Sequence, residues 1–383
     1  MIVDVVDNGG VCVVLRNLLY NIDTSKYEID ILSFEENKKY ESQLPDSVKI
    51  RNVYKKNPIK HKNKYIRYIY SLLREICPKW IIRRFIVKKK YDLAIDFKGN
   101  NLNVLTALKC RKLFWSHKDF SPITNPIEKR VIEEYSKTRS GAVKEKLFLK
   151  NLCKADGVIC ISEACKKAFV ERWNYPEERT HVLLNVLDVE EIQSKSIEKI
   201  TYSKTDKFTF CCMSRISSGK GIERLLNCVR TLNGMGYSFV LNIVGGGDTL
   251  NEMISLAKSM NVDNVVFFGN QDNPYPYVVE SDVFVCPSET EAYSMAVCEA
   301  LILGKPIITT KTASVPEIFG NSEYGLVVEN CEQEILAGMK RFLDEPELVD
   351  FYHKQAVKRL EYFDVQFRVN AVEEYIDEIA KNL

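Results

Sequence analysis

Short apolar runs alternate with longer segments of helical periodicity along the whole chain, and this alternation constrains the fold more than any other feature. When a helix joins two strands of one sheet, it serves as a crossover connection, and the two strands lie parallel. We therefore expect an α/β protein built on doubly wound parallel sheets. In the first half the predicted strands are 2–6, 29–34, 93–97, 112–115, 157–161 and 181–184, with a helix over 11–20. In the second half they are 208–213, 238–244, 265–268, 283–285 and 306–309.

The length and the composition indicate two domains. A chain of 383 residues with 45% hydrophobic content can bury two cores and is too long for a typical single one. The polar stretch 189–206 is typical of a linker, so the domains are predicted at 1–188 and 207–364. The helical segment 367–383 has no further strand to serve.

The cysteines, the histidines and the hydropathy exclude several classes of protein. Twelve cysteines are scattered without a C-x-x-C pair, and the four histidines lie far apart in sequence, so neither disulfides nor a local metal-binding cluster is expected. No apolar run reaches the ~18 residues of a membrane span, and the sequence opens on a strand rather than on a signal peptide. We expect a cytoplasmic protein that is neither secreted nor integral to a membrane.

A net charge of +2 conceals a strongly basic stretch at 51–90, where fourteen lysines and arginines stand against Glu75 alone. Aromatic and aliphatic residues lie between the charges, and such a helical stretch can bind an anionic membrane surface peripherally. An ordinary solvated face over core residues explains the same pattern equally well. Nucleic acid is not an expected partner, because no recognisable binding motif accompanies the charge.

The segment 281–310 carries the clearest signs of chemistry. An apolar run ends at Cys286 and Pro287 in a polar loop with Glu291, and a helical pattern then carries Glu299. On one straight helix the two carboxylates would be roughly 12 Å apart, which is beyond the ~5 to 9.5 Å of a glycosidase acid/base pair. They suit the two ends of one long ligand better.

The first turn of the helix would direct its N–H groups at an anion in the middle of that ligand. That turn is predicted over Tyr293, Ser294, Met295 and Ala296. The arrangement fits a nucleotide diphosphate-sugar.

Five segments carry recognisable patterns. The segment from Pro287 to Pro306 has the pattern P-S-x-x-E-x7-E-A-x3-G-x-P. The segments 185–188, 214–221, 244–247 and 267–270 are similar to N-G-x-D, G-R-x4-K-G, V-G-x-G and F-x-G. In this order along the chain, the five segments resemble those of the retaining glycosyltransferases of family 4, also called glycosyl transferases group 1, which have the GT-B fold.

The resemblance implies an architecture and a reaction. Two Rossmann-like domains would face a cleft, with the C-terminal helix (365–383) crossing back to complete the acceptor-binding domain 1–188. Domain 207–364 would bind the nucleotide-sugar. The implied activity is transfer of a hexose from a UDP-sugar, or another nucleotide diphosphate-sugar, with retention of anomeric configuration. The acceptor would be a saccharide or a lipid-linked saccharide of cell-surface polysaccharide biosynthesis.

The resemblance also assigns roles to single residues. Arg215 and Lys220 would neutralise the departing diphosphate, whose negative charge grows as the glycosidic bond breaks. Glu299 resembles the carboxylate that accepts both ribose hydroxyls, and Glu291 the one that contacts sugar hydroxyls or phosphate. His117 resembles a strand-end histidine near the acceptor, although a packed structural histidine explains it equally well.

Further donor contacts are implied in both domains. Gly9 and Gly10 would let the backbone approach the diphosphate at the start of a helix. Gly245 and Asn270 lie in the matching turn segments of the second domain, and Tyr293, Ser294, Met295 and Ala296 belong to the predicted helix start.

No two aspartates lie two positions apart, so the D-x-D metal grip of the other large glycosyltransferase fold is absent from the sequence. We therefore expect no metal and no cofactor beyond the donor substrate, with Arg215 and Lys220 supplying the positive charge. Two alternatives remain open at this point. One is a GT-B nucleotide-sugar epimerase or hydrolase, and the other is a non-catalytic nucleotide-sugar-binding protein.

Overall fold

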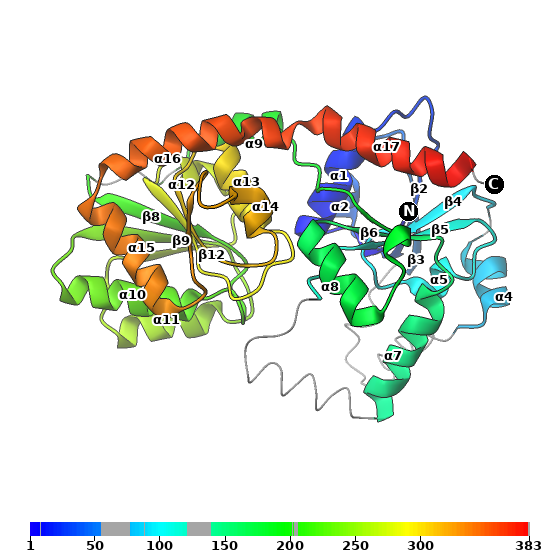
Figure 1. Cartoon of the computed structure of the whole chain (residues 1–383), viewed down its shortest axis with the longest axis horizontal. Helices are drawn as coiled ribbons and strands as arrows, with labels where there is room; N and C mark the ends of the chain where they lie inside the picture. The colour runs from blue at the N-terminus through cyan, green and yellow to red at the C-terminus, as the bar shows by residue number, and fades with distance from the viewer. Residues whose placement is uncertain are drawn as a thin grey trace. The chain divides into compact units, whose positions relative to one another are not determined.

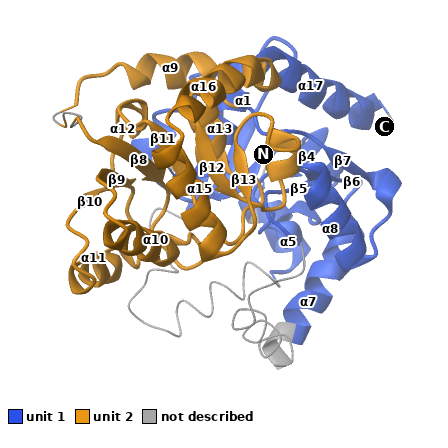
Figure 2. Ribbon diagram, turned by 60° about the vertical axis from the view of Figure 1, so that its left-hand side comes forward, with its two compact units in different colours: residues 1–186, 365–383 blue, residues 187–364 orange. Residues whose placement is uncertain are grey.

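The computed structural model describes residues 1–7, 9–54, 77–87, 89–120, 139–200, 202 and 206–381. The chain divides into two compact units, which Figure 2 shows in separate colours. Unit 1 consists of Met1–Val186 together with Val365–Leu383, and unit 2 is Leu187–Asp364. Each unit has its own parallel sheet and its own core.

Unit 1 is built on a seven-stranded sheet in the order β3-β2-β1-β4-β5-β6-β7, and every strand pair is parallel. The strand order reverses direction between β1 and β4, as in a doubly wound fold. The strands are β1 (Ile2–Val5), β2 (Asp30–Glu35), β3 (Lys49–Tyr54), β4 (Leu93–Asp96), β5 (Arg111–Ser116), β6 (Gly157–Cys160) and β7 (Thr180–Val182).

Helices and short helical turns join these strands. They are α1 (Gly10–Asn21), α2 (Lys38–Glu41), α4 (Lys79–Ile81), the π-helical turn η2 (Ile82–Ile86), α5 (Leu102–Leu105), α7 (Arg139–Leu152), α8 (Glu163–Trp173) and the 3-10 turn η3 (Glu177–Arg179). Helix α1 buries Val14, Leu15 and Leu18 completely, because these residues recur at the spacing of one helix face.

The C-terminal helix α17 (Val365–Lys381) belongs to unit 1, and Figure 1 shows it in red beside α1. Val369 and Val372 are fully buried. The ring of Tyr375 lies 4.1 Å from that of His181. Arg368 is also buried and donates a hydrogen bond to the carbonyl oxygen of Asn185. Apolar burial and one buried donor therefore fix the last helix to the first sheet.

Unit 2 repeats the plan with a six-stranded parallel sheet in the order β10-β9-β8-β11-β12-β13. The order reverses between β8 and β11. Its strands are β8 (Phe208–Met213), β9 (Phe239–Val244), β10 (Val265–Gly269), β11 (Val283–Cys286), β12 (Ile307–Thr310) and β13 (Leu326–Val328). Its helical elements are α9 (Val189–Ser196), α10 (Ile222–Gly234), α11 (Leu250–Ser259), α12 (Tyr275–Val279), α13 (Met295–Ile302), α14 (Val315–Phe319), α15 (Glu332–Asp344), α16 (Glu347–Lys358) and η4 (Arg359–Phe363).

The stretch 189–206, expected to be a linker, begins with the helix α9, which belongs to unit 2 and packs against α12 and α13. Asp188 caps this helix by accepting a hydrogen bond from the backbone N–H of Glu191. Glu190 and Glu191 occupy the first turn, where negative charge is favoured, and Lys195 forms an i,i+4 ion pair with Glu191. Polar residues here therefore make a surface helix rather than an extended connection.

Candidate functional site

The loops after β8 and β11 bring Lys220 and Glu291 together. These strands are neighbours at the point where the strand order reverses, and open α/β sheets bind ligands at the carboxyl ends of strands at such a point. The Nζ of Lys220 donates a hydrogen bond of 2.7 Å to Oε1 of Glu291. The Oγ of Ser288 donates to the same oxygen at 2.8 Å. The side chains of Lys220 and Glu291 are only 26% and 15% exposed, so this ion pair is partly shielded from solvent.

Close backbone packing explains several glycines around this pair. A Cβ on Gly245 would lie 1.9 Å from the carbonyl oxygen of Ser214, and one on Gly247 would lie 2.1 Å from that of Ile216. Gly245 also has a φ of 141°, which residues other than glycine rarely adopt. The loop after β8 and the loop after β9 therefore touch through their backbones, and the predicted donor contact Gly245 has a clear packing role.

Arg215 lies on the exposed side of the loop after β8. Among the residues that the structure describes, it forms no ion pair. Its guanidinium is therefore available to an anionic ligand, whereas Lys220 is already paired with a carboxylate. Asn270, just after β10, is also exposed, and its Cβ lies 3.2 Å from the position that a Cβ on Gly246 would take.

The helix that carries Glu299 begins two residues later than predicted. Helix α13 starts at Met295, and Ser294 is its N-cap residue with extended backbone angles, so Tyr293 and Ser294 lie outside the first turn. Both are buried, with 6% and 3% exposure. Met295 and Ala296 lie in the first turn as expected, at the end of the helix that favours anions.

Burial raises the pKa of Glu299 to about 8. A side-chain hydrogen bond with Tyr275 acts in the opposite direction, and the charge of Glu191 raises the pKa further. Burial therefore favours the protonated form of this carboxyl in the unliganded protein. Two hydroxyls that donate to it would favour the ionised form instead, because a carboxylate accepts hydrogen bonds at both oxygens.

In unit 1, the carboxyl ends of β1 and β4 carry a second polar group of residues at the reversal of strand order. Gly9 is the N-cap of α1 and Gly10 its first residue. The backbone N–H of Gly9 donates to Oδ1 of Asp7 at 2.9 Å. The Nζ of Lys98 donates to the carbonyl oxygen of Val5 at 3.0 Å and lies 3.4 Å from Oδ2 of Asp7. Asp7 thus shapes the turn that leads into α1.

His117 follows the last residue of β5 and packs against aromatic rings. Its ring centroid lies 4.9 Å from that of Phe97 and 6.0 Å from that of Trp115, with the latter pair stacked. Burial lowers the pKa of His117 to about 3, and the nearby charge of Lys98 acts in the same direction. Its Nε2 atom is buried and has no hydrogen-bond partner within the described part of the chain. His117 is thus a neutral, packed histidine with one unused polar atom.

The sequence did not single out Ser288 or Lys98. Ser288 stands in the P-S-x-x-E pattern, so the spacing to Glu291 was a usable signal. Lys98 follows the predicted strand 93–97 directly, and polar residues at the ends of parallel strands meet at one edge of the sheet.

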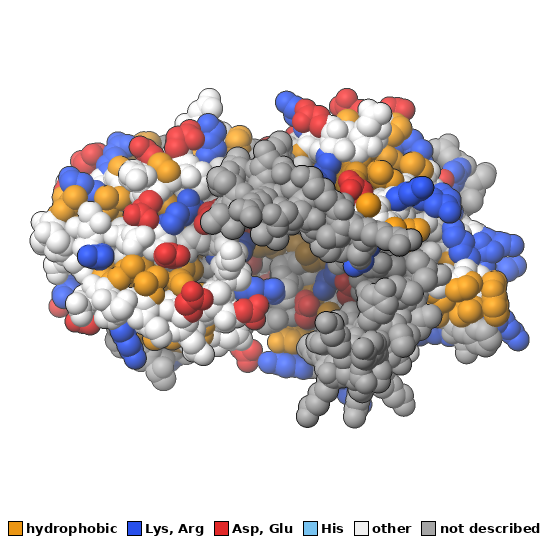
Figure 3. All heavy atoms as spheres, turned by 90° about the horizontal axis from the view of Figure 1, so that it is seen from below, with side chains coloured by type: hydrophobic (Ala, Val, Ile, Leu, Met, Phe, Trp, Pro, Cys, Tyr) orange, Lys and Arg blue, Asp and Glu red, His pale blue; other side chains and the backbone are white. Residues whose placement is uncertain are grey.

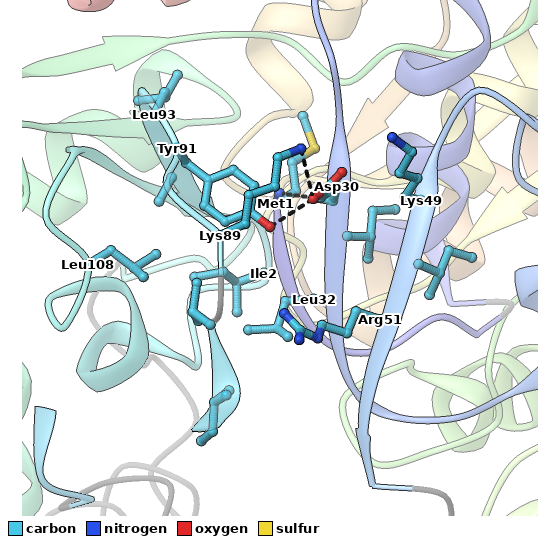
Figure 4. Close-up of a pocket in the computed structure, with 15 residues that line it drawn as sticks. Met1, Ile2, Asp30, Leu32, Lys49, Arg51, Lys89, Tyr91, Leu93 and Leu108 are labelled. Carbon is cyan, nitrogen blue, oxygen red and sulfur yellow. Dashed lines mark hydrogen bonds and ion pairs between the residues drawn. The ribbon is translucent and has the colours of Figure 1, made fainter. Parts of the chain in front are cut away.

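A separate cavity lies at the opposite edge of the unit 1 sheet (Figure 4). It is lined by residues at the starts of β1 to β4, including Ile2, Asp30, Lys49 and Leu93. Tyr91 donates a hydrogen bond of 2.8 Å to Asp30, and Lys89 lies 3.4 Å from the same carboxylate oxygen. Because parallel sheets bind substrates at the carboxyl ends of their strands, this cavity is not the candidate reaction site.

The described parts of the basic stretch 51–90 contain six of its fourteen cations, and the other eight lie outside the described residues. Three of the six bind within unit 1: Lys79 to the carbonyl of Thr106, Arg83 to that of Ala107, and Lys89 to Glu28 and Asp30. Arg84 and Lys90 are exposed, and so is Trp80, at 64%. In Figure 3, basic side chains lie beside an apolar patch at the end of unit 1 where Figure 1 labels α4.

Within the described residues, no helix is both long enough and apolar enough to cross a bilayer.

Two family models match the chain. The model of Glycosyltransferase Family 4 covers residues 8–191, and that of Glycosyl transferases group 1 covers residues 193–359. The matches meet close to the boundary between the two units.

Two curated proteins of similar sequence are sugar transferases by name. An N-acetylgalactosamine-N,N'-diacetylbacillosaminyl-diphospho-undecaprenol 4-alpha-N-acetylgalactosaminyltransferase of Campylobacter jejuni is 28% identical over 55% of this chain and 57% of its own length. The capsular polysaccharide biosynthesis glycosyltransferase CapM of Staphylococcus aureus is 27% identical over 54% of this chain and 57% of its own length. The chain thus spans little more than half the length of these relatives.

Solved structures of the same fold cover almost the whole chain. Sucrose-phosphate synthase of Thermosynechococcus elongatus has a TM-score of 0.74 at 17% identity, over 100% of this chain and 96% of its own. Anabaena Alr3699/HepE in complex with UDP and glucose has a TM-score of 0.73 at 16% identity, over 98% of both chains. The chain therefore belongs to the group 1 glycosyltransferases of family 4 and has the GT-B fold.

Proposed function

We propose that the protein transfers a hexose-type sugar from a UDP-sugar to a saccharide or a lipid-linked saccharide, with retention of anomeric configuration. The ion pair between Lys220 and Glu291 at the reversal point of the unit 2 sheet is the observation that carries this proposal. The names of two similar proteins support the substrate classes. The Campylobacter transferase is named for an undecaprenol-linked acceptor, and the Anabaena structure contains UDP and glucose.

In this proposal the charges of unit 2 act on the donor. Arg215 binds the diphosphate from the exposed side, and Lys220 turns from Glu291 toward a phosphate oxygen when the donor arrives. Glu291 then accepts hydrogen bonds from hydroxyls of the transferred sugar. Glu299 binds the ribose, because its carboxyl group is buried at the other end of the same segment and is suited to two hydroxyls. The donor is thus held at both ends.

The remaining assignments concern the middle of the donor and the acceptor. The first turn of α13, with Met295 and Ala296, faces the diphosphate in this proposal, and Tyr293 and Ser294 shape the approach to it. Gly245 and Asn270 adjoin the nucleotide. In unit 1, Gly9 and Gly10 contact the donor, and the unused Nε2 of His117 receives a hydroxyl of the substrate.

We also propose that two cations of the chain take the place of a metal ion. Arg215 and Lys220 stabilise the leaving diphosphate, and the donor phosphate accepts the proton of the attacking hydroxyl. Activity that persists in excess EDTA supports this assignment. Loss of activity in EDTA that Mg²⁺ or Mn²⁺ restores contradicts it.

The exposed cations and Trp80 of unit 1 support peripheral contact with an anionic membrane, where a lipid-linked acceptor resides. The proposed location is the inner face of the plasma membrane.

Calorimetric titration with UDP-, GDP- and ADP-sugars tests the donor assignment. We expect micromolar binding of one UDP-sugar and at least tenfold weaker binding of its GDP analogue. Release of UDP should require an acceptor, and nuclear magnetic resonance of the product should show the anomeric configuration of the donor. Release of UDP or conversion of the sugar without acceptor indicates a hydrolase or an epimerase. Binding without any turnover indicates a nucleotide-sugar-binding protein.

A further inference from the structure

The loop that carries Glu291 is held by side chains from three other segments of unit 2. This loop, residues 287–291, has no regular secondary structure and joins β11 to the turn before α13. Its first three carbonyl oxygens each accept a hydrogen bond from a different side chain. The pairs are Arg224 Nη2 to Pro287, Thr310 Oγ1 to Ser288, and Asn330 Nδ2 to Glu289.

Arg224 and Asn330 act on the loop as a unit. The Nη1 of Arg224 donates to Oδ1 of Asn330 at 2.9 Å, which leaves the amide Nδ2 to donate to the carbonyl oxygen of Glu289 at 2.8 Å. The guanidinium therefore sets the orientation of the amide as well as holding Pro287 directly. A planar guanidinium can serve both acceptors in fixed directions, whereas the single ammonium of a lysine cannot reproduce that fork.

The same arginine links this loop to the segment of Lys220. Arg224 lies in the first turn of α10, four residues after Lys220. Between them, Gly221 packs against the carbonyl of Pro287 so closely that a Cβ would lie 1.9 Å from its oxygen. Nearby, the backbone N–H of Glu289 donates to the carbonyl oxygen of Gly219 at 2.8 Å. The two segments that meet in the Lys220–Glu291 ion pair are thus tied together behind it.

Partners of Arg224 distinguish it from an ordinary surface arginine. It is half-buried, and across the described parts of unit 2 it forms no ion pair with a carboxylate. Within the part of the chain that the structure describes, it donates hydrogen bonds to Pro287 and Asn330 alone. Charge-assisted hydrogen bonds to carbonyl oxygens are stronger than neutral ones, so this arrangement limits the freedom of the loop.

We propose that Arg224 and Asn330 are positioning residues that set the place of Glu291 relative to Lys220 for the transfer reaction. The proposal rests on the function proposed above, but it concerns residues outside the family patterns. Neither side chain needs to touch the substrate. Their effect passes through the carbonyls of Pro287 and Glu289 to the carboxylate of Glu291.

Two substitutions remove the arginine fork and the amide donor separately. Arg224→Lys keeps the positive charge and loses the fork. Asn330→Asp keeps an acceptor for Arg224 and loses the donor to Glu289. Arg230→Gln, at an exposed arginine on the same helix, is the matched control. Melting temperatures of all variants confirm that the fold is retained.

Kinetics should show a specific pattern. We expect both substitutions to lower kcat about tenfold or more, because displacement of a reacting group by about 1 Å can cost 10²-fold. The Kd of free UDP should change by less than about twofold. In a Glu291→Gln background, Arg224→Lys should have no further effect on kcat, because the two changes act through the same carboxylate. Independent, multiplicative losses overturn the positioning role.

Hydrogen exchange tests the same proposal without any turnover. Amide protons of residues 288–292 should exchange at least tenfold faster in Arg224→Lys and Asn330→Asp than in the wild type, and Arg230→Gln should leave them unchanged. Unchanged exchange in both variants overturns the proposal even if the enzyme is active. If the wild type binds and transfers no sugar while exchange accelerates as expected, the loop is held as described and the proposed function is wrong.

Discussion

The backbone of Gly221 lies directly against the carbonyl of Pro287, and a Cβ atom on Gly221 would lie 1.9 Å from the carbonyl oxygen. Gly221 also has a φ of 70°. The residue therefore meets two demands that only glycine satisfies, a left-handed backbone and a close approach between the loops that carry Lys220 and Glu291.

Gly221→Ala should lower the stability of unit 2 by about 3 kcal/mol, because relieving the clash must shift backbone rather than a flexible side chain. Two other glycines near the same helix provide controls, and neither would bring a Cβ within 4 Å of other atoms. Gly236 has a φ of 87°, and Gly236→Ala should lower the free energy of unfolding by only about 1 kcal/mol. Gly234 lies at the end of α10, and Gly234→Ala should raise the free energy of unfolding by about 0.5 kcal/mol. Urea unfolding followed by circular dichroism measures all three. Equal effects at the three positions contradict the packing argument.

The raised pKa of Glu299 predicts a pH-dependent stability. In the unfolded chain this carboxyl loses its proton near its ordinary pKa of 4.5, whereas in the folded protein it does so near 8. The folded state therefore binds one more proton between these values. The contribution of Glu299 to stability is complete below about pH 4.5, falls as the pH rises from there, and is lost as the pH passes through about 8.

Glu299→Gln isolates this effect, because glutamine does not titrate and all other groups are shared. The melting temperature of the variant, relative to that of the wild type, should rise by several degrees between pH 5 and pH 9. Differential scanning calorimetry at six or more pH values provides the measurement. A difference that does not change with pH shows that the carboxyl is not buried as described.

The strands of the central sheets were predictable because buried parallel strands are continuous apolar runs. The expected strand 208–213 coincides with β8, and most other predicted strands agree with the structure within two residues. Two of the edge strands, β3 and β13, were not predicted. The first carries Lys49 and Arg51 and runs into the basic stretch that begins at Arg51, and the second has only three residues.

The candidate site was predictable only in part. Spacing placed Glu291 in a loop and Glu299 on a helix, and both predictions agree with the structure. The start of α13 was misjudged, because the sequence does not show that Ser294 stays extended. The contacts of Arg224 with Pro287 and Asn330 join residues 63 and 106 positions apart. Such pairings depend on tertiary packing and leave no local pattern.

Arg215→Ala and Lys220→Ala should each lower kcat by about 10²-fold or more, the usual order for removing one preorganised charge. Their effects on stability should differ. Arg215 is exposed, so its loss should leave the melting temperature unchanged. Loss of Lys220 deprives the partly buried carboxylate of Glu291 of its ion-pair partner and should lower the melting temperature by a few degrees. Initial rates and thermal scans check both parts. A near wild-type rate in either variant contradicts the diphosphate assignment.

The two carboxylates should contribute to different parts of donor binding. Glu299→Gln should weaken the binding of free UDP and of the intact UDP-sugar by a similar factor, because both ligands contain the ribose. Glu291→Gln should weaken the binding of the UDP-sugar more than that of free UDP, because the proposed partners of Glu291 are hydroxyls of the transferred sugar. Calorimetric titration of each variant with both ligands gives the four ratios. Equal losses for both ligands in both variants would falsify this division.

The last prediction concerns the exposed cations of unit 1. Arg84 and Lys90 are exposed, and Lys88 lies between them in sequence. Changing these three residues to glutamine should weaken binding to anionic vesicles by about two orders of magnitude, since each basic residue near the surface contributes about 1 kcal/mol. Arg83 and Lys89 are kept, because they bind other groups within unit 1. Sedimentation with vesicles of 30% phosphatidylserine gives the partition coefficient, and binding should also weaken with salt as the Debye length shortens.

A triple substitution in unit 2 controls for net charge. Lys258, Lys354 and Lys358 are exposed, and changing them to glutamine removes the same charge from a different surface. This control should bind anionic vesicles almost as well as the wild type, and both triple variants should keep the wild-type affinity for the UDP-sugar. Trp80→Ala should reduce the binding that persists at high salt, because the apolar ring contributes independently of charge. If the wild type binds anionic and neutral vesicles equally, or binds neither, the basic stretch is a solvated face and the lipid-linked acceptor must be reached in another way.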